Sequence, residues 1–155
     1  MKRIILVLLM VLGVAVFTGC RGIAELEEIY VQIEAEPIMH GNGFVSFVIT
    51  TNLPDDTSLM LTLQRAGELT GPQTHVTIER GAATSVRMSD QQQPISGTRI
   101  LLVSMGTAGT QSESVREVIG ANGEALAGPL VRTASSGSAY VRAEFEFDFS
   151  ETSAE

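Results

Sequence analysis

The sequence predicts an all-β domain, an antiparallel β-sandwich with one short helix behind an N-terminal signal peptide. Three observations support this prediction. Seven or eight runs of alternating or β-branched residues recur along the chain, separated by turns rich in Gly, Pro, Asn and Asp. Only one segment has helical periodicity, and no regular alternation of strands and helices indicates a parallel sheet. A closed barrel is the alternative arrangement of the same strands.

The first twenty residues have the three parts of a secretory signal. Lys2 and Arg3 precede an apolar run over residues 4–17, which is shorter than the roughly 20 residues needed to span a bilayer. The following Phe17-Thr18-Gly19-Cys20 resembles a bacterial lipobox, although Phe17 stands where an aliphatic residue is usual. That resemblance implies cleavage between Gly19 and Cys20 and a diacylglyceryl group on the Cys20 thiol. An ordinary signal peptide that leaves a free thiol, or an uncleaved N-terminal anchor, are the alternatives.

The expected organisation follows from this signal. We expect a lipoprotein signal peptide over 1–19, a lipidated Cys20 with a short tether over 20–28, a sandwich over 29–150 and a flexible tail over 151–155. Two or more acyl chains give stable attachment, so the domain would be held outside the cytoplasm on the cell membrane or the outer membrane. The membrane is thus the first expected partner, reached through Cys20.

Charge and cysteine content exclude several classes of protein. The net charge is −8, and residues 20–155 hold all 18 acidic residues, eight arginines and no lysine, which gives −10. Nucleic acids and anionic lipid head groups need a basic surface, so neither is an expected partner. With a single cysteine the domain has no internal disulfide, and a chain of this length can fold around an apolar core alone.

The first half of the domain predicts five strands. Residues 29–36 alternate between apolar and polar side chains, and Pro37 should end that strand because proline donates no ladder hydrogen bond. The turn at 40–43 leads to the β-branched and aromatic run 44–51, typical of a central strand. The strands expected next cover 58–65, with Leu59, Leu61 and Leu63 inward, 74–79 and 83–88.

The second half predicts another central strand over 98–105 and the one helix over 112–119. Ser114 and Glu117 have the spacing of a capping box, an apolar stripe is formed by Val115, Val118 and Ile119, and Gly120 suits the helix end. An irregular strand follows over 126–133.

The final strand, 140–149, alternates through ten residues, with three phenylalanines on one face. Its register is therefore firm, because a slip by one residue would expose them. Strands at this spacing favour an immunoglobulin-like sandwich.

Three segments resemble a family of immunoglobulin-like domains in small bacterial envelope proteins, many of them lipoproteins. Residues 51–57 with Leu59-Met60 are similar to its TNLPDGT-x-LM segment, 94–105 to its PL-x-G-x-Y entry to a long strand, and 111–128 to its Q-x-x-x-V-x-x-x-IG-x-x-GE-x-L-x-G segment. Asp56 replaces a glycine of the first motif, and Arg99 replaces a tyrosine of the second. The resemblance implies a fold and an envelope location, and no activity.

No catalytic set is evident in the sequence. His40 and His75 are the only histidines, Gly-x-Ser-x-Gly does not occur, and the carboxylates of 144–148 fit a solvated strand face. We therefore expect no catalytic residue, no metal site and no cofactor, and a hydrolase is the least favoured class.

The expected function is that of a lipid-anchored, non-enzymatic module that binds or supports another envelope protein. Asn52, Pro54, Asp55 and Asp56 form the expected contact loop, since loops on a rigid scaffold commonly carry binding residues. The alternative is a small-ligand or cation-binding lipoprotein that uses Asp55 and Asp56.

Overall fold

The computed structural model describes residues 26–90 and 93–150, which form two antiparallel sheets, a short parallel pair of strands and one short α-helix, with no closed barrel. The predicted signal peptide, Cys20, the first part of the tether and the tail lie outside the described residues. The elements are, in order, β1 (Ile29–Tyr30), β2 (Ile33–Met39), η1 (Gly41–Gly43), β3 (Val45–Thr51), β4 (Ser58–Arg65), β5 (Gln73–Thr77), β6 (Ala82–Thr84), β7 (Thr98–Met105), η2 (Ala108–Thr110), α1 (Glu113–Ile119), β8 (Leu126–Ala127), β9 (Val131–Thr133) and β10 (Ala139–Asp148).

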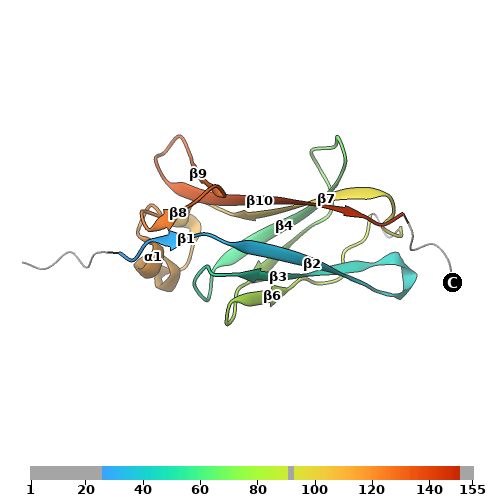
Figure 1. Ribbon diagram of the computed structural model, residues 1–155, viewed down its shortest axis with the longest axis horizontal. Helices are drawn as coiled ribbons and strands as arrows, with labels where there is room; N and C mark the ends of the chain where they lie inside the picture. The colour runs from blue at the N-terminus through green and yellow to red at the C-terminus, as the bar shows by residue number, and fades with distance from the viewer. Residues whose placement is uncertain (1–25, 91–92, 151–155) are drawn as a thin grey trace, which may run out of the picture.

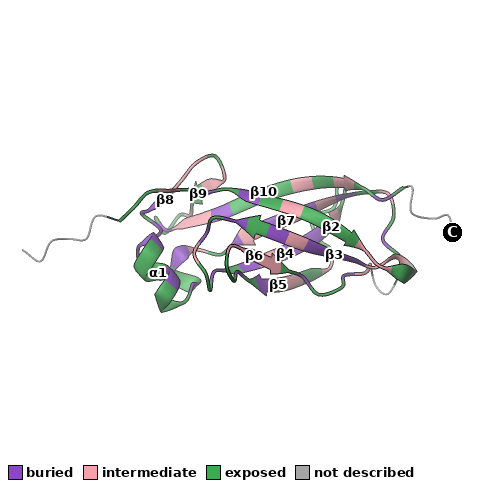
Figure 2. Cartoon of the chain, turned by 60° about the horizontal axis from the view of Figure 1, so that its bottom comes forward, coloured by how far each residue is buried: buried purple, intermediate pink, exposed green. Residues whose placement is uncertain are grey.

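Two antiparallel sheets enclose the core (Figure 1). One has five strands in the order β5-β4-β7-β10-β9, and the other has three in the order β2-β3-β6. Along β7 and β10, buried residues alternate with more exposed ones, whereas β3 is buried along most of its length (Figure 2). The sheets meet at Phe47 of β3 and Phe147 of β10, whose ring centroids are 5.5 Å apart.

The long strands lie where the sequence predicts them. The bounds of β4 and β7 match the prediction, and Leu59, Leu61 and Leu63 are at most 1% exposed. Pairing of β10 with β7 continues without a break from Val141 opposite Met105 to Asp148 opposite Thr98. The firm register expected for the last strand is therefore confirmed.

The prediction of one strand over 29–36 that ends at Pro37 was wrong in two ways. The segment divides into β1, which pairs in parallel with β8, and β2, which pairs antiparallel with β3. Strand β2 also continues through Pro37 to Met39. Because β2 is at the edge of its sheet, a residue without an N–H group can be accommodated there.

Helix α1 forms where it was predicted, but with a different cap. Ser112 is the N-cap and its Oγ accepts a hydrogen bond from the Val115 N–H, so the capping box expected from Ser114 was wrong. Val115 and Ile119 are fully buried, whereas Val118 is 47% exposed and does not join the buried stripe. Gly120 ends the helix with φ of 90°, a conformation that favours glycine.

The molecule is elongated, and its two ends differ. Helix α1, β1 and β8 lie at the end where the described chain begins, and β10 finishes at the opposite end (Figure 1). Among the helices within residues 26–90 and 93–150, none is both long and apolar enough to cross a membrane.

Candidate functional site

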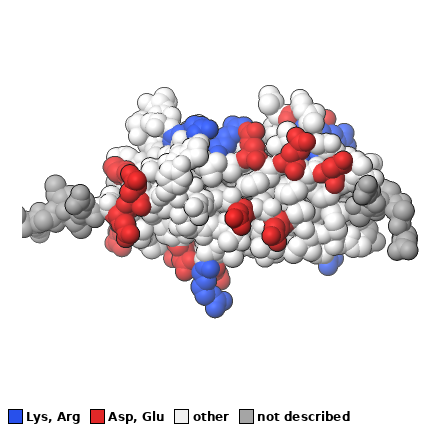
Figure 3. All heavy atoms as spheres, viewed as in Figure 1, with Lys and Arg blue, Asp and Glu red and all other residues white. Residues whose placement is uncertain are grey.

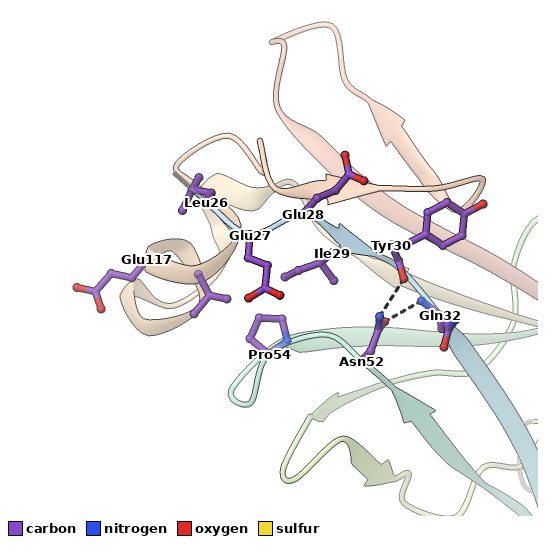
Figure 4. A pocket seen from close by; sticks show the side chains of 10 residues that line it. Leu26, Glu27, Glu28, Ile29, Tyr30, Gln32, Asn52, Pro54 and Glu117 are labelled. Carbon is purple, nitrogen blue, oxygen red and sulfur yellow. Dashed lines mark hydrogen bonds between the residues drawn. The ribbon is translucent and has the colours of Figure 1, made fainter. Parts of the chain in front are cut away.

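A groove lies at the end of the molecule where the described chain begins, between the segment 26–32, the loop after β3 and helix α1 (Figure 4). Its volume is about 660 Å³. We call it the N-terminal groove; its lining residues are Leu26, Glu27, Glu28, Ile29, Tyr30, Gln32, Asn52, Pro54, Glu117 and Val118.

The segment between β1 and β2 is held in place by Asn52. The Asn52 Nδ2 group donates to the carbonyl of Tyr30 at 2.9 Å, and the Asn52 Oδ1 atom accepts from the N–H of Gln32 at 2.8 Å. The Thr51 hydroxyl donates to the Gln32 carbonyl at 2.6 Å. These bonds satisfy backbone groups at the point where the chain leaves β8 and joins β3, so Asn52 has a structural role in the wall of the groove.

The two aspartates of the expected contact loop bond to the protein itself. The Gly81 N–H donates to Asp55 Oδ1 at 3.3 Å, and the Ser114 hydroxyl donates to Asp56 Oδ2 at 3.2 Å. Asp56 has φ of 67°, a left-handed conformation that Asp tolerates better than most residues.

Helix α1 is attached to the strands through the buried side chain of Gln111. Its Oε1 atom accepts from the Ser58 N–H at 2.9 Å, and its Nε2 group donates to the Ser58 carbonyl at 3.2 Å. This pair of bonds continues the ladder at the start of β4. The helix wall of the groove, with Glu117 and Val118, is thereby fixed relative to the loop wall.

Apolar side chains are concentrated in the N-terminal groove. Six large apolar side chains of the described residues are exposed, and three of them, Leu26, Tyr30 and Val118, line it. Leu26 packs against Gly120 and Tyr30 against Gly128, where a Cβ atom would come within 3.0 Å and 3.3 Å of the respective side chains. Because glycine has no Cβ atom, Gly120 and Gly128 provide the space that the Leu26 and Tyr30 side chains occupy.

The charge of the groove is negative. Glu27 extends into it toward Pro54, whereas the Glu28 and Glu117 side chains point away from it (Figure 4). No lysine, arginine or histidine is among the lining residues, and the three carboxylates form no ion pair within residues 26–90 and 93–150. Figure 3 shows acidic side chains at this end of the molecule and others spread along the same face toward the opposite end.

Another acidic group lies just beyond α1. The backbone N–H of Glu124 itself, followed by the N–H and side-chain amide of Asn122, holds the pKa of Glu124 below its usual range. This carboxylate therefore stays ionised and adds to the negative charge of the end that carries the groove.

The other residues considered from the sequence lie apart. His40 Nε2 bonds to the Ser46 hydroxyl beside η1, and His75 is exposed on β5 opposite Met60. In the described part of the chain, no group of three or more His, Cys, Asp or Glu side chains could hold a metal ion.

Sequence reasoning found the loop side of the groove but not the rest. Asn52 and Pro54 line it as members of the expected contact loop, whereas Asp55 and Asp56 do not. Leu26 was assigned to the tether, Val118 to the apolar stripe of the helix and Glu117 to a capping box. Only the three-dimensional position of α1 brings these residues beside Asn52 and Pro54.

Comparison of the chain with protein-family models, curated proteins and solved structures finds no match.

Replacing Asn52 by Ala should loosen the N-terminal strand. The Gln32 N–H and the Tyr30 carbonyl would each lose a partner, at a cost of about 1–2 kcal/mol. We expect faster amide hydrogen exchange at Gln32 and at Val31, which donates to Ala127 of β8. Asn52→Asp keeps the acceptor for Gln32 and should have a smaller effect at that amide. Unchanged exchange in Asn52→Ala would contradict the structural role.

Proposed function

We propose that this protein is a lipid-anchored cell-envelope module that binds another envelope component and carries out no catalysis itself. Its described part would be an immunoglobulin-like sandwich, a proposal supported by two antiparallel sheets of five and three strands on either side of one core. The segments that resemble envelope-protein domains hold structural positions, such as Gln111 against Ser58 and Asp56 with positive φ.

The observation that carries the proposal is the short distance between the lipobox and the domain. Leu26 follows Cys20 by six residues, so even a fully extended chain would place it within roughly 20 Å of the lipidated residue. Leu26 also lies at one end of an elongated molecule (Figure 1). A lipid on Cys20 would therefore hold the end with α1 near the membrane and direct the opposite end away from it.

The polar side chains of the loops near the groove support binding over catalysis. Asn52, Asp55 and Asp56 are each engaged with backbone or side-chain groups of the domain. A general base or nucleophile must instead reach a substrate atom. These loops are therefore better suited to form a binding surface than an active site.

Intact mass measurement of the mature protein from cell membranes tests the anchor. We expect cleavage before Cys20 and a mass increase from a diacylglyceryl group with or without an additional acyl chain. Cys20→Ser should lose the modification and leave the membrane fraction, whereas Thr18→Ser, which keeps a small residue before the cleavage site, should behave like the wild type. Native protein with an unmodified thiol would contradict the proposal.

A further inference from the structure

We propose that the N-terminal groove binds a cationic peptide segment of an envelope protein, one that presents arginine or lysine side chains around an apolar one. The inference rests on the proposed function, because it specifies the chemistry of the partner that the module would bind. Its evidence is the combination of exposed apolar side chains, negative charge that has no ion-pair partner among residues 26–90 and 93–150, and position at one end of the molecule.

The apolar part of the groove requires an apolar side chain from the partner. Leu26 and Val118 are 39% and 47% exposed and line the groove with Ile29 and Pro54, whereas the Tyr30 ring points away from Pro54 and lies against Gly128 (Figure 4). Their exposure leaves apolar surface that an occupant of the groove could cover. Burying these side chains under a partner residue would remove apolar surface from water, the main driving force of association.

The charged side chains of the groove determine the sign of the charge that its partner should carry. Glu27 extends into the groove, and Glu117 belongs to its α1 wall with the carboxylate pointing outward (Figure 4). Neither carboxylate has an ion-pair partner in the described part of the chain. Complementary charge speeds association and rejects partners of the same sign. A cationic segment would place one charge against Glu27 inside the groove and another near Glu117 outside it, while its apolar side chain contacts the apolar wall.

The same charges disfavour the two other occupants of an apolar groove. An anionic lipid surface would be repelled by the groove and by Glu124 nearby. A second copy of the domain would approach with a net charge of −10 for residues 20–155. A cationic partner segment satisfies both the apolar and the acidic surface of the groove.

The test uses the full mature protein in nanodiscs of zwitterionic lipid and an arginine-rich peptide with one central leucine. Glu27→Gln/Glu117→Gln should weaken peptide binding about tenfold, a loss expected when two charge contacts to one partner are removed. The matched control, Glu36→Gln/Glu146→Gln, removes the same charge from exposed positions of β2 and β10 and should weaken binding less than about twofold. Calorimetry measures each affinity.

A second pair of measurements tests the apolar contact. Val118→Ser, and separately replacement of the central leucine of the peptide by serine, should each weaken binding by about fivefold. The two changes together should weaken it little more than either alone, because both remove one contact. Fully additive losses would overturn the proposed insertion of the leucine beside Val118.

Several results would overturn the proposal as a whole. These are equal weakening by the groove variant and its matched control, absence of peptide binding by the wild type, or binding of anionic vesicles that is lost in the groove variant. If intact mass shows that the protein carries no lipid and the protein still binds the peptide, the groove proposal is supported and only the proposed lipid anchor is contradicted. If the protein is lipidated but its groove variant binds the peptide as the wild type does, the lipid anchor is supported and the groove proposal is contradicted.

Discussion

Replacing Phe47 by Ala should produce the largest loss of stability in the molecule. Phe47 is fully buried in the middle of β3, and its ring meets Phe147 of the opposite sheet at 5.5 Å. Truncation of a buried phenylalanine costs about 3–5 kcal/mol in free energy of unfolding, which combines lost transfer energy with the cavity left behind. Domains are stable by only about 5–15 kcal/mol in total, so the variant should be at the edge of folding.

Thermal unfolding followed by circular dichroism measures this effect, with a decrease in Tm of roughly 10–20 °C expected. Phe47→Leu keeps most of the volume and should cost less than half as much, because a smaller cavity remains. Leu69→Ala is the surface control, since Leu69 is 91% exposed, and should change stability by less than about 0.5 kcal/mol. Equal Tm values for Phe47→Ala and Leu69→Ala would contradict the described core.

The strands could be predicted because their information is local. In β4 and β10 every second residue is apolar, and period two determines which face is buried without reference to the rest of the chain. The helix could be predicted for a similar reason, from a short apolar stripe and Gly120. Its cap was assigned wrongly because Ser112 and Ser114 are both suitable N-cap residues, and tertiary contacts decide between them: the Ser114 hydroxyl bonds to Asp56, 58 residues away.

The change of partner between β1 and β2 could not be predicted. The alternation of residues 29–36 continues through the change, since Val31 and Ile33 are both buried. The neighbouring strands divide the segment. Strand β8 pairs with β1, β3 pairs with β2, and Asn52 bonds to the backbone between β1 and β2. A pattern in one strand contains no information about which strand lies beside it.

The groove was hidden for the same reason. Leu26, Val118 and Asn52 come from three parts of the chain, and in each part the local pattern has an ordinary interpretation: tether, helix stripe and turn. Val118 belongs to the apolar stripe predicted for the helix, and yet its side chain is 47% exposed. Residues at which a local pattern and the observed burial disagree are therefore useful indicators of a binding surface.

Arg99 of β7 is a buried charged residue, and its surroundings show how its charge is accommodated. The Arg99 side chain is 5% exposed, and its Nε group donates to the Ser96 carbonyl at 3.0 Å. One terminal nitrogen lies 3.2 Å from Asp90 Oδ2, an oxygen that Arg65 also approaches at 2.6 Å. A buried guanidinium is tolerated only with such partners, because an isolated charge is costly to remove from water.

Replacing Asp90 by Ala should therefore destabilise the protein by about 3 kcal/mol, because Arg99 would remain buried without a counter-charge. Arg65→Ala removes the other member of the cluster, but this side chain is 54% exposed. An exposed ion pair contributes at most about 1 kcal/mol, so the Arg65 variant is the matched control. Urea unfolding gives both free energies, and salt should diminish only the Arg65 contribution strongly.

The double variant Asp90→Val/Arg99→Met separates the cost of an unpaired charge from the value of the pair. With both charges removed, stability should return to within about 1 kcal/mol of the wild type, since buried ion pairs often contribute little over apolar residues of similar volume. Recovery would show that Asp90 is needed because Arg99 is present. A double variant as unstable as Asp90→Ala would instead show that Asp90 stabilises the turn to Gln93, with which it exchanges two backbone hydrogen bonds, independently of Arg99.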